Sequence, residues 1–481
     1  ADDDPLLRQV TSTSDNCLGS KCPDFSSCFV AKARRAAQAA DVVVINHHLL
    51  FADYLLKEEG FGQILSGVDV CIIDEAHQLP ELAAAFFGVR LSTRQLHELC
   101  KDTETEAGKL ADIAHVGECV AELGRRAATL ESGFAQMPNR ITLHEFLNNG
   151  RVSEAVQAAR DALQALYESI KPYEERSAEM ASCVARAAAL VERLQTILDE
   201  QDHERVRWVE ALGRGGSLHA TPILVAEGFR RMAATYPGAW IFTSATLAAS
   251  EDFSHFSGQL GLDQARELKL DSPFDFSTQA RLYLPKGMPD PSDPAYSDAV
   301  ADAALPLIQA SGGGAFVLCT SHRALRRIAE RLRPKLKQKL YVQGDDSRAA
   351  LLQAFAADGD GVLIGTSSFW EGVDVKGRAL RLVIIDKLPF TAPGDPVFEA
   401  KLAAIRAGGG NPFNDFQVPQ AITALRQGVG RLIRDAADRG LLALCDPRLR
   451  SKMYGRRMLA SLPQMPVLSE LADAQQWLRS L

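Results

Sequence analysis

Residues 68–73 form an apolar run that ends in two adjacent carboxylates, Asp74 and Glu75, with His77 close behind. A continuous apolar run of this length predicts a strand of a parallel sheet, which helices cover on both faces. The carboxyl end of such a strand lies at the edge of the sheet where open α/β folds bind ligands. An aspartate there can hold Mg²⁺ and a glutamate can orient a water molecule, as in nucleoside triphosphatases. A solvated loop or helix start is the alternative interpretation.

The rest of the first half of the chain contains strand signals on either side of a long helical region. Residues 41–46 predict a second buried strand, and residues 240–243 predict a third. From about residue 91 to residue 205 Ala, Glu, Arg and Leu dominate, and apolar residues recur at helical spacing over 156–170 and 184–198. A Lys-Pro breaker between these two segments predicts an antiparallel helical pair.

A second series of strand signals follows a proline-rich stretch at 285–294. Strands are predicted at 315–319, 361–364 and 382–385, and helical segments lie between them. Alternating strands and helices predict a βα-repeating domain with a parallel sheet. The expected fold class is therefore α/β.

The composition is that of an ordinary globular protein without a strong overall charge. The 481 residues carry a net charge of −8, with 46% apolar and 24% charged residues. Any contact with nucleic acid must use local basic patches, of which 323–339 is one, although a solvated helix face is the more common meaning of such a run. Nine cysteines, an odd number, favour a reducing cytoplasm over a disulfide scaffold. We find no signal peptide and no apolar stretch of membrane-spanning length.

Three further segments carry groups suited to phosphates or to contacts between domains. Thr243–Leu247 has small hydroxyl residues that could link the sheet end to a neighbouring domain, and Gly365–Asp374 can bring hydroxyls and backbone N–H groups close to phosphates. Each is also typical of an ordinary turn after a strand. Gln427–Arg434 is more specific, because Arg431 and Arg434 are three residues apart and would share one face of a helix. Two guanidinium groups on one face suit phosphate oxygens and transition-state charge, and a surface salt-bridge stripe is the alternative.

Three cysteines, Cys17, Cys22 and Cys28, lie within twelve residues ahead of the Asp-Glu strand. A cluster of soft thiolates in a cytosolic protein selects zinc or iron–sulphur. On the residues alone, zinc or structural thiols are favoured. The other six cysteines fall in predicted strands or helices and are interpreted as structural.

In order, these motifs resemble helicase motifs II, III, V and VI of superfamily two. Trp-Glu-Gly-Val-Asp at 370–374, Lys-Leu-Pro-Phe at 387–390 and the block at 427–434 are similar to the second motor domain of the iron–sulphur branch, the XPD/DinG family, and most similar to its bacterial DinG and YoaA members. The resemblance covers nearly the whole chain. It implies an α/β protein with two RecA-like motor domains, the first incomplete, interrupted by an iron–sulphur element and a helical arch-like insertion.

The resemblance also implies domain boundaries. The iron–sulphur region is expected at 1–40 and the insertion at 91–205. The first motor domain would comprise 41–90 and 206–274, and the second would comprise 275–481.

The resemblance further implies ATP-dependent 5′-to-3′ unwinding of DNA, in repair or replication. Asp74 is expected to hold Mg²⁺ and Glu75 to orient the attacking water. His77 and Gln427 are expected to couple the nucleotide to contacts between the domains. ATP binding is expected of Asp74, Gly430, Arg431 and Arg434, and the two arginines are expected to act on the γ-phosphate in the transition state rather than on DNA. Nucleic-acid contact or coupling is expected of Thr246, Thr366, Glu371 and Asp374.

The implied cofactors are ATP, Mg²⁺ and a 4Fe–4S cluster. Cys17, Cys22 and Cys28 would supply three of its four ligands, and the fourth is expected upstream of residue 1. The implied partners are single-stranded and forked DNA and replication or repair proteins, with no membrane, in the cytoplasm.

No glycine-rich loop ending in Gly-Lys-Ser/Thr is found, and Gly312–Gly314 has no following lysine. We expect the segment that carries this loop to precede the present chain, so that the chain alone hydrolyses little or no ATP. Two alternatives remain open. One is a non-catalytic DNA-binding or repair-complex partner protein that kept the fold, and the other is a nuclease-linked DinG relative.

Overall fold

The computed structural model divides into two compact units. Unit 1 comprises Ala1–Phe242, Gln259–Leu262 and Ala392–Gly408, and unit 2 comprises Thr243–Gly258, Asp263–Thr391 and Gly409–Leu481. The residues that the structure describes are 17–19, 22–58, 65, 67–109, 113–135, 137–213, 215–248, 252–366, 369, 375 and 377–481.

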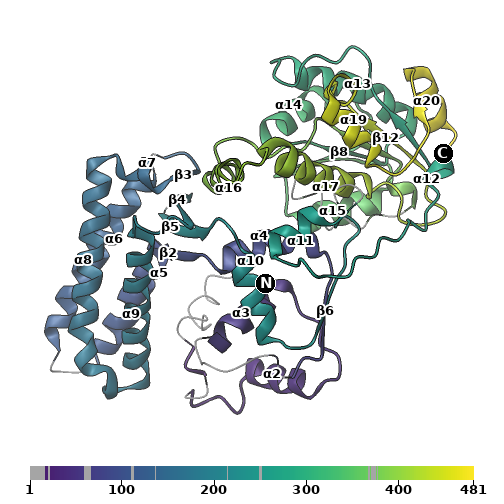
Figure 1. Ribbon diagram of the computed structural model, residues 1–481. Helices are drawn as coiled ribbons and strands as arrows, with labels where there is room; N and C mark the ends of the chain where they lie inside the picture. The colour runs from purple at the N-terminus through teal and green to yellow at the C-terminus, as the bar shows by residue number, and fades with distance from the viewer. Residues whose placement is uncertain are drawn as a thin grey trace. The chain divides into compact units, whose positions relative to one another are not determined.

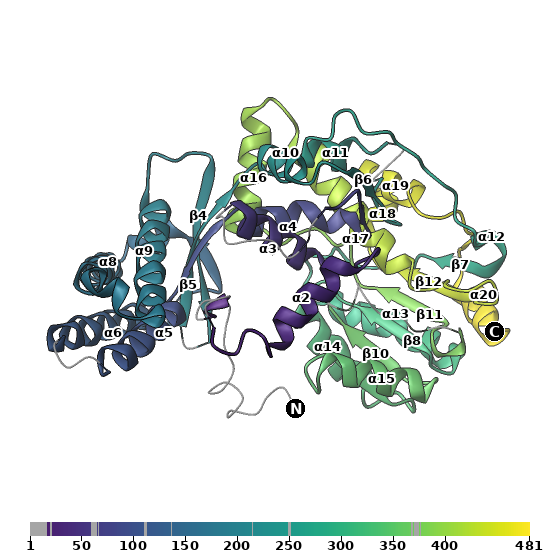
Figure 2. The same ribbon diagram turned by 90° about the horizontal axis from the view of Figure 1, so that it is seen from below.

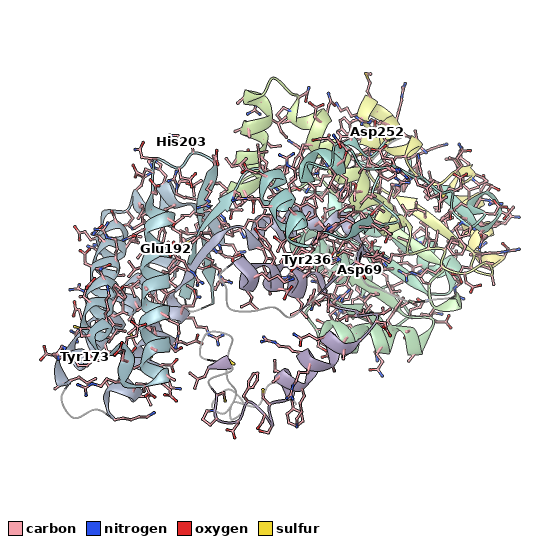
Figure 3. All side chains as sticks on the ribbon, turned by 60° about the horizontal axis from the view of Figure 1, so that its bottom comes forward. Asp69, Tyr173, Glu192, His203, Tyr236 and Asp252 are labelled. Atoms are coloured by element: carbon pink, nitrogen blue, oxygen red, sulfur yellow. The ribbon has the colours of Figure 1, made fainter. Side chains whose placement is uncertain are left out.

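Unit 1 contains a parallel pair of strands, β1 (Val70–Ile73) and β6 (Ala239–Phe242), which confirms the strands predicted at 68–73 and 240–243. Ile73 pairs with Phe242, so both strands end together. Figure 3 shows Tyr236 close to Asp69, whose carbonyl oxygen accepts the N–H of Ala239 at 2.8 Å. The helices around this pair are α2 (Phe29–Ala39), α3 (His47–Glu58), α4 (Leu79–Phe86) and α10 (Ala226–Thr235).

A buried carboxylate joins α3 to the chain beside β6. Asp53 is fully buried, pairs with Lys57 at 3.0 Å and accepts the Tyr236 hydroxyl at 2.6 Å. Burial, followed by the hydrogen bond to Asp53, raises the pKa of Tyr236. The Tyr236 phenol is therefore neutral at neutral pH.

The strand predicted at 41–46 is wrong. Residues 43–46 have no regular secondary structure, and the side chains of Val42 and Val44 are 81% and 93% exposed. An apolar β-branched run becomes a buried strand only where a neighbouring strand takes up its backbone hydrogen bonds. Among the described residues, the parallel sheet at this place consists of β1 and β6 alone.

Residues 93–198 form a helical bundle, as predicted (Figure 1). The segment at 156–170 lies in α8 and the segment at 184–198 lies in α9, and a 3₁₀ turn, η3, joins them at the predicted breaker. Figure 3 shows Tyr173 and His203 at opposite ends of α9, with Glu192 between them. The helices are α5 (Thr93–Ala107), α6 (Ala114–Phe134), α7 (Leu143–Leu147), α8 (Gly150–Ile170), η3 (Lys171–Arg176) and α9 (Ala178–Leu198).

An antiparallel sheet covers one side of this bundle and was not predicted. Its order is β2-β5-β4-β3, and its strands are β2 (Val89–Ser92), β3 (Arg140–Thr142), β4 (Arg205–Leu212) and β5 (Gly215–Pro222). Val209 and Leu218 face the helical core, because alternate residues of a strand point to one face. Residues in 206–222, which the sequence analysis assigned to the first motor domain, therefore pack against the helical bundle.

Unit 2 is built on a seven-stranded sheet of order β13-β7-β12-β11-β8-β10-β9, in which all six pairings are parallel (Figure 2). The three strands predicted from sequence are β8, β10 and β11. The strands are β7 (Ala280–Tyr283), β8 (Ala315–Leu318), β9 (Leu340–Val342), β10 (Val362–Gly365), β11 (Leu382–Ile385), β12 (Gly440–Leu444) and β13 (Val467–Leu468).

Helices cover both faces of this sheet, which explains why its central strands are apolar throughout. Phe316 and Leu318 of β8 pack in the core beside α15 and α17, whereas Ala315 and Val317 pack beside α13 and α14. One face is covered by α13 (Tyr296–Ser311), α14 (His322–Leu332) and α20 (Leu471–Arg479), and the other by α15 (Arg348–Asp358), α17 (Val418–Val429) and α19 (Met453–Ala460). Shorter elements are α11 (Ser254–Leu260), α12 (Phe276–Gln279), η5 (Gly377–Ala379), the π-helical turn η6 (Phe413–Gln417) and α18 (Arg448–Ser451).

One helix, α16 (Pro396–Ala407), belongs to unit 1 although the chain before and after it belongs to unit 2. Asp395 caps it by accepting the N–H groups of Val397 and Phe398, and the other carboxylate oxygen accepts Arg140 of β3 at 3.0 Å. No helix among the described residues is long and apolar enough to cross a membrane.

Candidate nucleotide and nucleic-acid sites

Asp74 and Glu75 follow β1 directly, at the carboxyl end of the parallel pair. Glu75 has φ 49° and ψ 41°, and among the described residues it is the one non-glycine with positive φ. This left-handed conformation costs an L-residue about 1–2 kcal/mol, and such strain clusters at functional sites. The Glu75 N–H donates to Asp74 Oδ1 at 2.9 Å, which fixes the turn. Both side chains are exposed, as ligands of a hydrated metal must be.

His77 lies in the next turn, η2 (Ala76–Gln78), and its side chain is only 11% exposed. Its Nδ1 is 3.4 Å from Glu75 Oε2, so the imidazole orients the glutamate. The predicted trio of Asp74, Glu75 and His77 is therefore one local cluster.

The segment after β6 carries Thr246 and belongs to unit 2. Thr246 is 5% exposed, and its N–H donates to Ser244 Oγ at 3.1 Å. Arg426 of α17 donates to the carbonyl oxygen of Ala248 at 2.5 Å. Within unit 2, the segment that carries Thr246 is therefore held by the helix that carries Gln427.

The expectation that Arg431 and Arg434 share a face of a helix is wrong. Helix α17 ends at Val429, Gly430 caps its carboxyl end, and both arginines lie in the loop beyond it. Glycine is strongly preferred just past a helix, so Gly-x-Gly at this point is a stop signal and not a start. Gln427 alone of the predicted side chains remains on the helix.

A buried carboxylate that the sequence analysis missed holds this loop. Asp438 is 7% exposed, and its Oδ2 accepts the N–H groups of Arg434 and Asp435 at 2.8 and 2.9 Å. Its Oδ1 accepts the N–H of Gly377 at 3.1 Å. The loop that carries the arginines is thus fixed by its own downstream residue, through hydrogen bonds to backbone N–H groups that no short sequence motif reveals.

Thr366 follows β10 but is engaged structurally. Its N–H and its hydroxyl both donate to Gln343 Oε1, at 2.6 and 2.9 Å, and the residue is 5% exposed. Glu371 and Asp374, which were predicted to contact nucleic acid or to couple the domains, lie outside the described residues.

Four of the eight basic residues in the run at 323–339 are paired with acids, among them Arg333 with Asp345 at 3.4 Å. Arg327 and Arg331 of α14 form two-pronged pairs with Asp298 and Asp302 of α13, and Lys335 also reaches Asp302. Such exposed pairs contribute about 0–1 kcal/mol each and mainly define a solvated face. The common interpretation of such a run is therefore right for these members.

Three members of the run, Arg323, Arg326 and Arg327, line a groove of about 720 Å³ in unit 2, and Asp293 and Glu330 line it too. Arg323 and Arg326 meet Ser321, the N-cap of α14, and Lys387, which follows β11. The amino end of a helix carries partial positive charge, so this groove is suited to an anion. It lies at the carboxyl end of the parallel strands, where such sheets bind ligands.

The structure does not gather the three early cysteines into a metal site. Cys17 is exposed, Cys22 and Cys28 are partly buried, and the described residues contain no group of three or more His, Cys, Asp or Glu placed to hold an ion. Burial raises the pKa of the other thiols for which a shift is seen, which disfavours the thiolate form: Cys71, Cys100, Cys183, Cys319 and Cys445.

Comparison with known proteins agrees with this architecture. Residues 304–465 match the family described as the helicase C-terminal domain. The chain is 43% identical over 479 residues to the ATP-dependent DNA helicase YoaA of Escherichia coli. This match covers 99% of this chain and 75% of that protein. It is 29% identical over 510 residues to the ATP-dependent DNA helicase DinG of Photobacterium profundum, covering 96% of this chain and 73% of that one.

The chain belongs to the YoaA/DinG family of ATP-dependent DNA helicases. A solved structure of Xpd4 from S. tokodaii superimposes with a TM-score of 0.57 at 14% identity, over 90% of this chain and 83% of that one. At that identity the likeness shows the fold alone, which is that of the XPD helicases with their RecA-like domains. The resemblance inferred from the motifs is confirmed.

Proposed function

We propose that this chain supplies most of an ATP-dependent helicase that moves along single-stranded DNA and unwinds duplexes. The strained turn at Glu75 carries the proposal, because it presents two exposed carboxylates at the end of a parallel strand. Asp74 would hold the Mg²⁺ that accompanies ATP, and Mg²⁺ supplies charge neutralisation of the phosphates. Glu75, held by His77, would orient the attacking water.

The loop after α17 would supply the positive charge for the same reaction. Arg431 and Arg434 follow a capped helix end, and Asp438 fixes the backbone that carries Arg434. Phosphoryl transfer depends on positioning and on charge stabilisation, so a guanidinium on a fixed loop acts by meeting the γ-phosphate. Gln427 and the Thr246 segment would couple that event to the strand that bears Glu75.

The groove in unit 2 would bind the DNA backbone. Arg323, Arg326 and Lys387 supply cations, and the amino end of α14 supplies N–H groups. Phosphate contacts of this kind give affinity without base preference, which suits a protein that moves along a strand. Single-stranded and forked DNA would be the substrates, and the cytoplasm would be the setting.

Cys17, Cys22 and Cys28 would hold an iron–sulphur cluster together with one further ligand. These three thiols lie in a turn-rich segment ahead of α2, and the Cys28 N–H donates to the Asp24 carbonyl at 3.0 Å. A bound cluster would supply a rigid cross-link to a segment with little core of its own. The chain's own part is to present three thiolates on one short segment.

Arg434→Ala in the full-length protein tests the assignment to ATP chemistry. An arginine that meets the transition state is worth about 10³–10⁵ in rate, whereas a DNA phosphate contact changes affinity and its salt dependence. We expect ATP turnover at saturating single-stranded DNA to fall by about 10³ while DNA affinity stays within a few-fold. Glu75→Gln should give the same pattern.

Arg456→Ala, a change of an exposed arginine on α19, is the matched control and should leave turnover unchanged. If Arg434→Ala binds DNA weakly but hydrolyses ATP at the normal rate once DNA is saturating, this arginine contacts DNA and does not act on ATP. Normal turnover in Glu75→Gln would remove the proposed catalytic role of the carboxylate.

A further inference from the structure

Asp386 is a buried carboxylate at the carboxyl end of β11, where the parallel strands of unit 2 end. Its side chain is 1% exposed, and it follows Ile385, the last residue of the strand. Among the described residues, no lysine or arginine side chain forms a hydrogen bond or ion pair with its carboxylate oxygens. A carboxylate taken out of water without a cation costs free energy, so its hydrogen bonds must hold it.

All of those hydrogen bonds go to two neighbouring loops. Asp386 Oδ1 accepts the N–H of Thr320 at 3.0 Å and the N–H of Lys387 at 2.7 Å. Its Oδ2 accepts the Thr320 hydroxyl at 3.3 Å. The Tyr296 hydroxyl donates to the Asp386 carbonyl at 2.6 Å. One carboxylate therefore joins the loop after β8 to the loop after β11.

The residues next to these bonds are the ones that line the groove. Ser321 follows Thr320 and caps α14, and Lys387 also lines the groove, with its ammonium 5.7 Å from the Tyr296 ring centre. A change at Asp386 would move the start of α14 and Lys387 together. Asp386 itself does not line the groove, so any effect on a ligand passes through these neighbours.

We propose that Asp386 is a positioning residue that sets the spacing between the amino end of α14 and Lys387 to fit the phosphates of single-stranded nucleic acid. This inference rests on the proposed function, because it assigns the groove to DNA. The charge of the carboxylate is not what the ligand uses, since a negative charge near a phosphate is unfavourable. The carboxylate acts through its two oxygens, which accept hydrogen bonds from the two loops.

The proposal separates two substitutions at one position. In Asp386→Asn the amide oxygen still accepts both N–H groups and the amide nitrogen can donate to the Thr320 hydroxyl, so the spacing is kept. In Asp386→Ala both N–H groups lose their acceptor. Single-stranded oligothymidylate affinity, measured by fluorescence anisotropy from low to high salt, should fall about tenfold in Asp386→Ala and stay within twofold in Asp386→Asn.

The salt dependence gives a readout that general destabilisation does not move. Each single-strand phosphate that the protein binds adds about 0.7 to the slope of log affinity against log salt. Asp386→Ala should lower that slope by about this amount for every phosphate that the groove no longer holds, and Asp386→Asn should keep the wild-type slope. Thr320→Val, which removes only the Oδ2 bond, should give a smaller reduction and provides the test if Asp386→Ala does not fold.

Ser311→Ala is the matched control. Ser311 is a buried polar residue that ties the loop at the opposite end of β8, by donating to the Ile308 and Gly313 carbonyls at 3.0 and 2.8 Å. This substitution should lower stability without changing affinity or salt slope. Equal reductions of affinity in Asp386→Ala and Ser311→Ala, or in Asp386→Ala and Asp386→Asn, would overturn the proposal.

The proposed function can fail separately from the positioning role. If the wild-type protein did not bind oligothymidylate, the groove would not be a DNA site, and this inference would fail with it. Binding that Arg323→Ala and Lys387→Ala leave unchanged would locate DNA elsewhere. If Arg323→Ala and Lys387→Ala weaken DNA binding but Asp386→Ala does not, the groove remains a DNA site. Only the positioning role of Asp386 is then excluded.

Discussion

At the scale of single residues, Asp386 ties stability to pH in an unusual direction. Burial raises its pKa from 3.8 to about 6, against the opposing effect of its hydrogen bonds. The folded protein therefore binds a proton more tightly at this site than the unfolded chain does. Stability falls as pH rises from about 4 to about 6, and the full penalty is present above that range.

Asp386→Asn removes this titration. We expect the free energy of unfolding of Asp386→Asn relative to wild type to rise by on the order of 3 kcal/mol between pH 4 and pH 7, since each pKa unit corresponds to ~1.4 kcal/mol. Urea unfolding followed at a series of pH values measures the difference. Ser311→Ala, which titrates nothing, should show an offset that does not change with pH. A flat difference for Asp386→Asn would show that this carboxyl does not titrate in the range.

The roles expected of Asp74, Glu75 and His77 rested on a strand end, and the structure places all three in one turn there. The end of a strand is predictable because a short apolar run that is followed by charged residues can form few other structures in an α/β protein. Asp386, Asp438 and Gln343 were not predicted, because each acts through hydrogen bonds to loops from other parts of the chain. No period or short motif encodes such a contact.

At the scale of elements, prediction succeeded for the long periodic helices and for the apolar strands of the parallel sheets, and failed for the antiparallel sheet and for the shortest strands. The two segments around the breaker became α8 and α9, whose apolar stripes are buried. Strands β9 and β13 are only three and two residues long, and too little pattern exists in them to be seen. Residues 41–46 have a strong strand pattern, but propensity yields where no neighbouring strand is present to pair.

Helix α16 depends on a small charge network at its amino end. Arg140 donates to Glu210 at 2.9 Å and to Asp395 at 3.0 Å, and its guanidinium lies 4.7 Å from the Trp208 ring centre. Asp395 is both the partner of Arg140 and the cap of α16. The helix is therefore anchored to β3 and β4 where it begins.

Arg140→Ala should loosen the first turn of α16. Because the Arg140 side chain is 43% exposed, water screens the pairs, and we expect a decrease in stability of about 1 kcal/mol. Hydrogen exchange of the Val397 and Phe398 amides should become about fivefold faster. Arg126→Ala, which removes an exposed pair with Glu122 on α6, is the matched control and should leave those amides unchanged. Unchanged exchange in Arg140→Ala would show that packing alone holds the helix.

The early cysteine segment is an element whose order would depend on a bound cluster. Anaerobic purification of the full-length protein should give a brown sample with broad absorbance near ~400 nm, from thiolate-to-iron charge transfer. Cys22→Ser should lose this absorbance and most of the bound iron, and Cys119→Ser on α6 should keep both. Zinc in stoichiometric amount, without iron or sulphide, would contradict the assignment.

At the scale of the whole molecule, the groups that we propose to act on ATP are not accompanied by a recognisable phosphate-binding loop. No Gly-Lys-Ser/Thr loop occurs in the 481 residues. Positioning supplies most of the rate in phosphoryl transfer, so we expect residues 1–481 alone to hydrolyse ATP roughly a hundredfold or more slowly than the full-length protein at saturating DNA. DNA-stimulated turnover by the isolated chain, abolished by Glu75→Gln, would show that another segment binds the phosphates.

Helix α16 packs in unit 1 while the chain on either side of it belongs to unit 2, and this limits how a protease can separate the two units. The chain passes between the two units at 242/243, 258/259, 262/263, 391/392 and 408/409, so no single cut separates them. Gly394 and Gly409, at φ 96° and 80°, lie in exposed loops that flank the helix and offer sites for a protease. A nick at either loop would leave two polypeptides that part under denaturing conditions and migrate as one native particle. A fragment trimmed to unit 2 would instead contain α16 without the part of unit 1 that covers it. The buried residues Pro396, Phe398 and Leu402 would then be exposed to solvent.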